Sequence, residues 1–329
     1  MGESNFFLII GLGSIGKRHL NNLMNLGIKN IIIVSKSIVL PHEFSCFLNY
    51  QDLQKAILEN NISHAFVCTP TSNHLQDLKI LLKNNIENVY LEKPVSHNLE
   101  ELENIKPLLN NCKRLVVGFD LHFDPGLNKI RTILNDKKLG KIFSINAVVG
   151  QYLPDWRPDQ DHRLGMSAKI IQGGGVMLDL IHEFDYLRWL VGIPKKIACV
   201  YQKNSILEIE TEDVADVLIH FNHGQSGTIH LDYHQKKLVR NCMITCENGT
   251  IFWDLVQSEV RMEQHREEKV TFNYRGFDRN QRYIEILKCF LNETHWDERL
   301  TTFEDALISL KMVVLAKIAS EQEAFLTFD

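Results

Sequence analysis

A glycine-rich turn between an apolar run and an amphipathic stretch is the feature that most constrains what this chain can fold into. The run Phe6–Ile10 ends directly at the turn, and the helical pattern that follows covers Lys17–Leu26. The glycines match the spacing G-x-G-x-x-G, which between a strand and a helix is typical of a turn that binds the pyrophosphate of a dinucleotide. We therefore predict cofactor binding by Gly11, Gly13, Ser14, Ile15 and Gly16.

The stretch before residue 120 alternates apolar runs with amphipathic patterns, whereas the later part does not. Near-continuous apolar strands that alternate with helices predict a parallel sheet covered on both faces. After Gly118, alternating strands such as Val214–Phe221 and Gly227–His234 flank tight turns, which predicts an antiparallel sheet. The apolar pattern Val176–Leu190 predicts a helix within this later region. The predicted strands of the first region are Phe6–Ile10, Asn30–Val34, His64–Cys68, Asn88–Leu91 and Arg114–Gly118.

Length and charge narrow the class of protein. The chain has 329 residues, enough for two domains, with 44% apolar residues and a net charge of −5. This balance gives no electrostatic reason to expect nucleic acid or a membrane surface as a partner. No apolar run approaches the length of a transmembrane helix, and the N-terminus lacks the pattern of a secretory leader. With seven scattered cysteines, we expect a cytoplasmic protein with reduced thiols.

The ends of the predicted parallel strands carry polar side chains that fit a cofactor site. Ser35 and Lys36 follow the second strand, where a site selective for NAD places an acidic residue, so hydroxyls and a cation favour the 2′-phosphate of NADP. Alternatively, Lys36 is a solvated loop lysine. Two further strand ends carry Thr69-Pro70 with His74, and Glu92-Lys93-Pro94. A lysine at Lys93 can hydrogen-bond a substrate hydroxyl and help its deprotonation, although a lone lysine after a strand is usually a surface charge.

A second candidate site follows three consecutive glycines in the later region. Gly173–Gly175 precede a predicted helix that carries Asp179, His182 and Asp185. Residues three apart share a helical face, so His182 is flanked by acids and can act as a general base near neutral pH. The spacing fits a hydrogen-bonded core histidine equally well.

The segment before these glycines is long and irregular. It carries an aromatic side chain, Trp156, and two arginines, Arg157 and Arg163, close to Tyr152. Aromatic faces suit sugar rings and arginines suit phosphate or carboxylate groups, so we predict substrate contacts from Trp156, Arg157 and Arg163. The alternatives are a structured interface loop, or arginines that pair with neighbouring aspartates and only stiffen the loop.

Histidines and aspartates also gather on one predicted hairpin. Ligands of these types can hold zinc, but their spacing matches no standard metal motif, and we predict no metal. They are His220, His223, His230, His234, Asp216 and Asp232.

The four signatures together resemble the Gfo/Idh/MocA oxidoreductase family. The matching motifs are Gly11–Gly16, Thr69-Pro70 with His74, Glu92-Lys93-Pro94, and Gly173–Gly175 with the His182 helix. The resemblance implies an α/β protein: a Rossmann domain, residues 1–120, with a doubly wound parallel sheet, and a substrate-binding and oligomerisation domain, residues 121–329, with a large, mainly antiparallel open sheet. It also implies a homodimer or homotetramer built through that sheet.

The resemblance implies an NAD(P)-dependent oxidoreductase that acts on a hydroxyl or keto group of a sugar, nucleotide sugar or acidic sugar. Lys93 and His182 carry the proton chemistry, with Asp179 as acidic companion. The family often spaces the acid and the histidine four apart, while here they are three apart, so Asp179 is displaced by one residue from the family's position. The segment from Gln151 to Arg163 is similar to a family subset tied to surface-polysaccharide sugars.

Two other functions fit part of the pattern. A non-catalytic dinucleotide-binding sensor or assembly protein keeps the glycine-rich turn but needs neither Lys93 nor His182. A methyltransferase uses a similar turn for an adenosine ligand.

Overall fold

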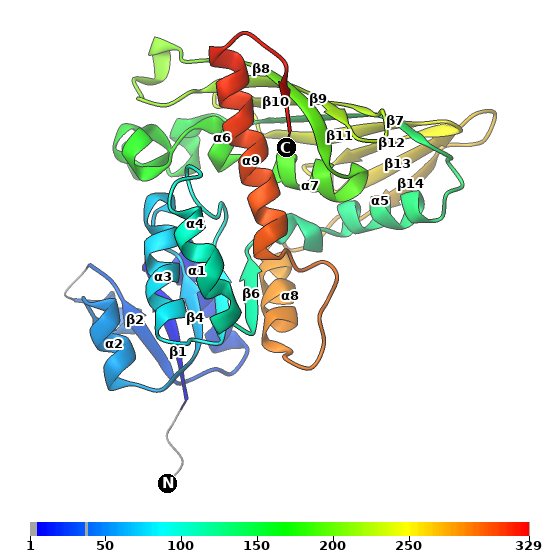
Figure 1. Cartoon of the computed structure of the whole chain (residues 1–329). Coiled ribbons are helices and arrows are strands. Elements are labelled where there is room, and N and C mark those ends of the chain that lie inside the picture. Colours follow the sequence, from blue (N-terminus) through cyan, green and yellow to red (C-terminus); the bar gives the residue numbers. More distant parts are fainter. Residues whose placement is uncertain (1–4, 37–38, 329) are drawn as a thin grey trace. The chain divides into compact units, whose positions relative to one another are not determined.

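The chain forms two compact units that are not continuous in sequence. The computed structural model describes residues 5–36 and 39–328 (Figure 1). Unit 1 comprises the residues up to Phe119 together with Tyr283–Leu307, and unit 2 comprises Asp120–Arg282 and the residues from Ile308 onward. The chain therefore passes between the units three times. The predicted first domain, residues 1–120, lacks Tyr283–Leu307, which the structure groups with it.

Unit 1 is built on a parallel sheet. Within the described residues it has six strands in the order β3-β2-β1-β4-β5-β6. The order reverses direction between β1 and β4, and in a doubly wound sheet ligands bind at such a reversal, beyond the carboxyl ends of the strands. The strands are β1 (Phe6–Ile10), β2 (Ile31–Val34), β3 (Leu48–Tyr50), β4 (Ile62–Val67), β5 (Asn88–Leu91) and β6 (Arg114–Val117).

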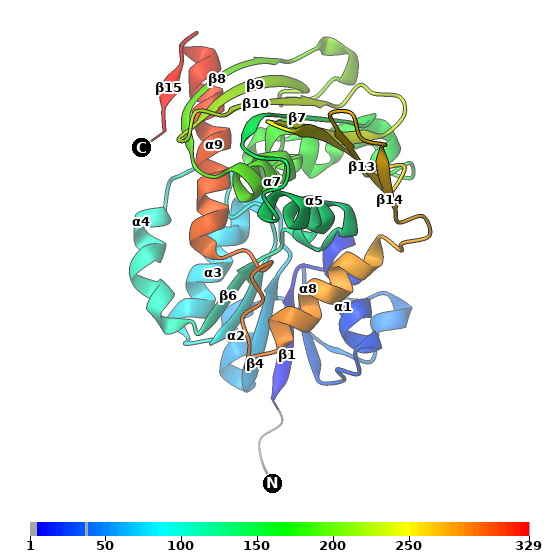
Figure 2. The same ribbon diagram turned by 90° about the vertical axis from the view of Figure 1, so that its right-hand side faces the viewer.

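Helices cover both faces of this sheet, which explains why its strands are almost continuously apolar (Figure 2). On one face, the ring of Phe290 packs edge-on against Phe66 and Tyr90, with centroids 5.5 and 5.6 Å away. On the other face, α2 packs on α3 and α3 on α4. The helices are α1 (Ser14–Asn25) and α8 (Asn280–Leu291) on the first face, and α2 (Leu53–Glu59), α3 (His74–Lys83) and α4 (Leu102–Ile105) on the second.

Unit 2 is built on a mainly antiparallel sheet. Its described residues form nine strands in the order β14-β13-β12-β11-β7-β10-β9-β8-β15. The pair β7 and β10 is parallel, which the predicted series of hairpins does not include. The strands are β7 (Ile142–Gly150), β8 (Pro194–Gln202), β9 (Val214–Phe221), β10 (Ser226–Asp232), β11 (Val239–Cys246), β12 (Gly249–Asp254), β13 (Glu259–Gln264), β14 (Val270–Asn273) and β15 (Leu326–Thr327).

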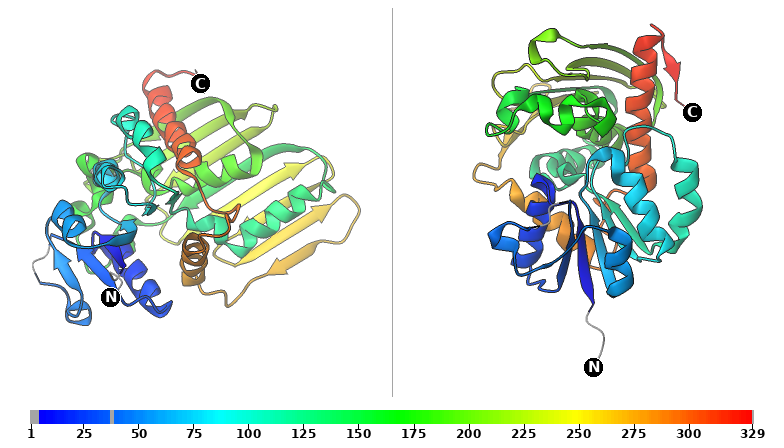
Figure 3. Two further views of the ribbon diagram at one scale, coloured as in Figure 1. Left: turned by 60° about the horizontal axis from the view of Figure 1, so that its bottom comes forward. Right: turned by 90° about the vertical axis from the view of Figure 1, so that its left-hand side faces the viewer.

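The helices of unit 2 pack on one face of this sheet (Figure 3). The alternation in β9 follows from that arrangement, because every second side chain from Ala215 to Phe221 is buried while those between are exposed. The opposite face presents Val200, Leu218 and Met243 with 62%, 42% and 41% of their surface exposed. The helices are α5 (Pro125–Asn135), α6 (Val176–Asp179), α7 (His182–Val191) and the part of α9 (Phe303–Glu321) from Ile308 onward.

Two further observations concern the whole chain. All seven cysteines are free thiols. Among the residues that the structure describes, no helix is both long enough and apolar enough to cross a membrane.

Candidate functional site

The glycine-rich turn of unit 1 has the shape that a phosphate-binding turn requires. Gly11 adopts φ +92°, and a Cβ there would lie 2.7 Å from the carbonyl oxygen of Cys68. A Cβ at Gly16 would overlap the carbonyl oxygen of Gly11, whereas a Cβ at Gly13 would meet no atom within 4 Å. Helix α1 starts at Ser14, and no side chain caps its N-terminus by accepting hydrogen bonds from its first N–H groups. The turn therefore fits a pyrophosphate against Gly13.

The loops after β4 and β5 lie at the same edge of the sheet, because these strands are parallel neighbours. The ring of His74 connects the two loops. Its Nε2 lies 2.9 Å from the carbonyl oxygen of Thr69, and its Nδ1 lies 2.7 Å from that of Pro94. Burial lowers the pKa of His74 although both carbonyls oppose this, and a neutral ring donates to only one of them. His74, which is 1% exposed, thus holds the loops rather than reaching out of them.

A second buried histidine connects the helix after the glycine-rich turn to the loop that carries Lys93. The Nε2 atom of His19, on α1, lies 2.7 Å from Oε1 of Glu92. The other oxygen of Glu92 accepts a hydrogen bond of 3.3 Å from the backbone N–H of Lys93. Lys93 is half-buried and precedes a cis peptide bond to Pro94. The predicted cofactor residue Glu92 is therefore engaged within the protein and fixes the backbone at Lys93.

The end of β2 lies beside the glycine-rich turn, since the N–H of Gly11 donates to the carbonyl oxygen of Val34 at 2.8 Å. Ser35 follows, buried, and its hydroxyl donates to Oδ1 of Asn49 at 3.3 Å. Lys36 is exposed, and Ser37 lies outside the described residues. The structure thus places Ser35 and Lys36 at the edge where the sequence predicts them.

In unit 2, the predicted helix Val176–Leu190 is two helices. α6 ends at Asp179 and α7 begins at His182, with Leu180 at φ −101° and ψ 30° between them. The expectation that Asp179 and His182 share one helical face is therefore wrong, because that argument needs a continuous helix.

The two acids that flank His182 in sequence contact other residues. The hydroxyl of Tyr233 donates to Oδ2 of Asp179 at 2.6 Å. Oδ2 of Asp185 lies 2.7 Å from Nε2 of His122. Burial would raise the pKa of Asp185, but His122, Arg188 and Ser309 outweigh it, so the net direction is downward.

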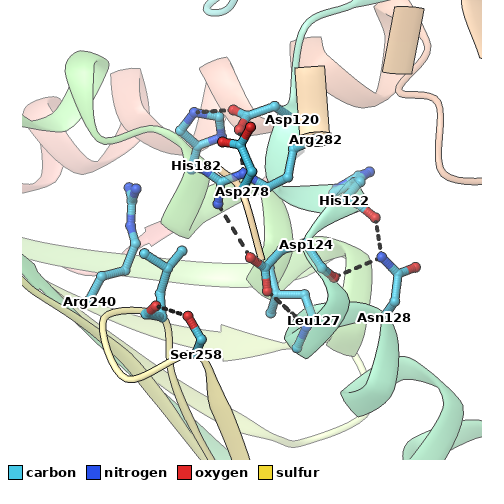
Figure 4. Close-up of polar contacts among 12 residues, drawn as sticks. Asp120, His122, Asp124, Leu127, Asn128, His182, Arg240, Ser258, Asp278 and Arg282 are labelled. Atoms are coloured by element: carbon cyan, nitrogen blue, oxygen red, sulfur yellow. Dashed lines mark hydrogen bonds and ion pairs between the residues drawn. The ribbon is translucent and has the colours of Figure 1, made fainter. Parts of the chain in front are cut away.

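His182 instead faces Asp120, a residue that the sequence analysis does not single out (Figure 4). Nε2 of His182 lies 3.6 Å from Oδ1 of Asp120, and the other carboxylate oxygen lies 3.0 Å from Nε of Arg282. Arg282 also reaches Asp124 at 3.4 Å. All four side chains are less than 9% exposed. A signal was present in the sequence, since Asp120 lies three residues after β6, and ligands bind beyond the carboxyl ends of parallel strands.

A buried ion pair anchors the start of α7 to the sheet. Glu183, next to His182, accepts two hydrogen bonds of 2.8 and 2.9 Å from Arg240 on β11. Burial disfavours the charge of Arg240, but Glu183 more than offsets this and raises its pKa. A bidentate pair of this kind fixes orientation, so the direction in which α7 begins is defined.

The predicted substrate residues differ in their surroundings. Trp156 packs edge-on against the ring of Tyr233, with centroids 5.4 Å apart, and the hydroxyl of Tyr233 contacts Asp179. Arg163 is held by Asp161 through Nε and Nη2, at 2.9 and 2.8 Å, and by Glu208 at 2.6 Å. Arg157 is exposed. Among the predicted residues, Trp156 and Asp179 therefore both contact Tyr233. Arg163 forms ion pairs with Asp161 and Glu208.

Two of the histidines predicted on the hairpin, His230 and His234, also contact carboxylates. His230 lies 2.7 Å from Asp216 and 3.2 Å from Asp232, and these two carboxylates, Asp232 first, raise the pKa of His230 to about 9. Nε2 of His234 lies 3.2 Å from Asp213. Within the part of the chain that the structure describes, no group of three or more His, Cys, Asp or Glu residues is arranged to hold a metal ion.

Comparisons with known proteins agree with this architecture. An uncharacterized oxidoreductase of Bacillus subtilis, YrbE, is 28% identical over 67% of this chain and 65% of its own length. The inositol 2-dehydrogenase of Rhizobium meliloti is 23% identical over 56% of this chain and 54% of its own length. The matched region thus spans about two thirds and about half of these curated relatives. The structure of a levoglucosan dehydrogenase in complex with NADH superposes with a TM-score of 0.85 and 16% identity, covering 99% of this chain and all of that chain.

Family assignments cover most of the chain. Residues 6–119 match the oxidoreductase family with an NAD-binding Rossmann fold. Residues 127–252 match the GFO/IDH/MocA C-terminal domain. The two matches fall on unit 1 and unit 2 respectively, in the order that the resemblance predicts. The chain therefore belongs to the Gfo/Idh/MocA family of oxidoreductases.

Proposed function

We propose that this chain is an NAD(P)-dependent dehydrogenase that acts on a hydroxyl or keto group of a sugar, nucleotide sugar or acidic sugar. The observation that carries the proposal is the edge of the unit 1 sheet. There the glycine-rich turn, the Thr69 loop and the Lys93 loop are held in one place by His19 and His74. The names of the relatives support the substrate class, since one is an inositol dehydrogenase and another a levoglucosan dehydrogenase.

The cofactor would be bound by the residues at that edge. The N–H groups of Gly13, Ser14 and Ile15 bind the pyrophosphate, and Gly16 keeps α1 close to β1. When bound, the nicotinamide supplies the hydride chemistry. Ser35 and Lys36 favour NADP slightly over NAD, because a cation and a hydroxyl suit a 2′-phosphate where an acid would repel it.

The proton chemistry falls to Lys93 and His182. The ammonium group of Lys93 orients and polarises the substrate oxygen, and its backbone is fixed by Glu92. His182 takes the hydroxyl proton during oxidation and returns it during reduction. Asp179 acts indirectly, by accepting a hydrogen bond from the hydroxyl of Tyr233, and Trp156 packs against the ring of that tyrosine.

Substrate recognition would come from the segment before the glycines of unit 2. Trp156 offers an aromatic edge to a sugar ring, while Arg157 and Arg163 are the candidates for an anionic group. Of the two arginines, Arg157 is the better candidate, since Arg163 already binds Asp161 and Glu208.

For the whole protein, we propose a cytoplasmic homodimer or homotetramer. The open face of the nine-stranded sheet, with Val200, Leu218 and Met243 exposed, supports an interface between copies of the chain.

Absorbance of the reduced nicotinamide tests the proposal. The purified protein is mixed with NAD or NADP and a panel of myo-inositol, levoglucosan, uronic acids and UDP-sugars. We expect the reduced-cofactor band to grow with at least one substrate, and to be lost in Lys93→Ala. If cofactor binds tightly by calorimetry while no member of a broad sugar panel is turned over, a non-catalytic dinucleotide-binding role replaces the dehydrogenase.

A further inference from the structure

The carboxylate of Asp120 lies between the side chains of His182 and Arg282, two residues of unit 2. His182, at the start of α7, faces one oxygen at 3.6 Å, and Arg282, on α8, faces the other at 3.0 Å. Asp120 is 4% exposed, so water does not screen these contacts as it would at the surface. Arg282 leaves the charge of Asp120 compensated and fixes the direction in which the carboxylate points.

The neighbouring acidic side chains each have a partner other than His182. Asp124 caps α5 through the N–H groups of Gly126 and Leu127, and its Oδ2 turns to Arg282. Glu183 is committed to Arg240. Asp278, labelled in Figure 4, precedes α8 and accepts from the N–H of Asn280.

From this geometry we propose that Asp120 is the positioning carboxylate for His182, in the role that the sequence suggests for Asp179. This deepens the proposed function and rests on it, because His182 is the group that exchanges the hydroxyl proton. A carboxylate within about 4–6 Å favours the charged imidazolium and orients the neutral ring so that its N–H points to the acid.

The proposal predicts the titration of His182. Isotope-labelled histidine in the full chain is followed by NMR across pH 5–9, with the His182 signal assigned by its loss in His182→Gln. We expect Asp120→Asn to move the midpoint of His182 to lower pH by roughly one pH unit, since the favourable charge is gone. The amide keeps the size of the side chain, and thermal unfolding checks that the variant is folded.

Asp124→Asn is the matched control. It removes a carboxylate that is similarly buried and also contacts Arg282, but that caps the first turn of α5. We expect this variant to move the His182 midpoint by less than a third of the Asp120→Asn shift. Equal shifts in both variants would show a general field rather than a specific partner, and would overturn the proposal.

A second measurement covers the case in which Asp120→Asn does not fold. In the unmodified protein with carboxyl-labelled aspartate, the Asp120 signal, assigned in Asp120→Glu, should shift at the same pH at which His182 titrates. If the Asp120 signal does not change at the pH at which His182 titrates, the pairing of these two side chains is contradicted.

Kinetics separate this proposal from the proposed function. With NAD or NADP and a substrate from the sugar panel, the acid limb of kcat/KM for oxidation should move to lower pH in Asp120→Asn, by the same amount as the NMR midpoint and with KM unchanged. If the unmodified protein turns over a sugar but the titration midpoint of His182 is unchanged in Asp120→Asn, the positioning role of Asp120 is rejected and the proposed function stands. If the midpoint shifts but the unmodified protein turns over no sugar, the proposed function fails while the pairing of Asp120 and His182 stands.

Discussion

The chemistry of individual residues depends here on where the backbone turns. Asp179 and His182 are three apart in sequence, yet α6 ends at one and α7 begins at the other. Asp179 consequently holds Tyr233, and the acid facing His182 is Asp120. Substitutions of Asp179 and His182 should therefore distinguish a direct role in proton transfer from an indirect one through Tyr233.

Replacing the proton-transfer residues should have graded effects. We expect Lys93→Ala and His182→Ala each to lower kcat by roughly 10²–10⁴, the usual range for losing a positioned acid or base. Asp179→Asn should cost less, because its carboxylate acts through Tyr233. Steady-state kinetics with the accepted sugar measure all three, and calorimetry should show unchanged cofactor affinity in His182→Ala. An Asp179→Asn variant more impaired than His182→Ala would reverse the order of these roles.

Cofactor choice should depend on the two residues after β2. Lys36→Ala should weaken NADP and leave NAD binding almost unchanged, since it removes the cation that favours a 2′-phosphate. Ser35→Asp should shift the preference toward NAD. Calorimetric titration of both cofactors measures this. A tenfold tighter binding of NAD by the unmodified chain would contradict the preference itself.

The sequence predicts much of this site, and the part that it does not predict has a common cause. The glycine-rich turn, the Thr69 loop and Lys93 follow from local patterns, because a strand end and its motif are adjacent in the chain. The contacts of Asp120 with His182 and Arg282 join residues far apart in sequence, and no local pattern encodes them. The break at Leu180 was also hidden, because an apolar run looks the same in one helix as in two.

Among the elements, the segment between β7 and α6 tests whether the substrate is anionic. Arg157→Ala should raise KM by about 10- to 150-fold, because a charge-assisted hydrogen bond is worth roughly 1.5–3 kcal/mol. Arg157→Lys should restore little if the contact is bidentate. Arg163→Ala is the comparison within the same segment, and it should leave KM nearly unchanged. A neutral sugar that serves as well as an anionic one, with KM unaffected by Arg157→Ala, would exclude this recognition.

The ion pair between Arg163 and Asp161 also predicts how the stability of the protein depends on pH. Hydrogen bonds from Arg163 lower the pKa of Asp161 to about 2 from its ordinary value of 3.8. Because the folded value is the lower one, the contribution of this carboxyl to stability is present above pH 3.8 and is lost as the pH falls toward 2. In Arg163→Ala, NMR of the carboxyl should show Asp161 titrating near its ordinary value. No change would mean that the pair does not persist in solution.

At the scale of the whole molecule, the open face of the unit 2 sheet predicts assembly. Leu218→Asp and Met243→Lys place charges among side chains that are 42% and 41% exposed on this face, so they should convert a dimer or tetramer into monomers. Ile171→Asp is the control, since Ile171 is 81% exposed but lies on the loop before α6. Light scattering coupled to gel filtration measures the mass. Assembly that survives both substitutions on the sheet, or that is lost in Ile171→Asp, would place the interface elsewhere.

The return of Tyr283–Leu307 to unit 1 has a consequence for how the protein is made. Phe290 covers Phe66 and Tyr90, yet it leaves the ribosome long after the sheet to which they belong. At 5–20 residues per second, the roughly 160 residues between Phe119 and Tyr283 take on the order of ten to thirty seconds to synthesise. During that time this face of the parallel sheet has α1 but lacks α8, so the edges of Phe66 and Tyr90 that Phe290 covers stay exposed. The nascent chain is then a target for chaperones, and a fragment that stops near residue 120 should aggregate rather than fold.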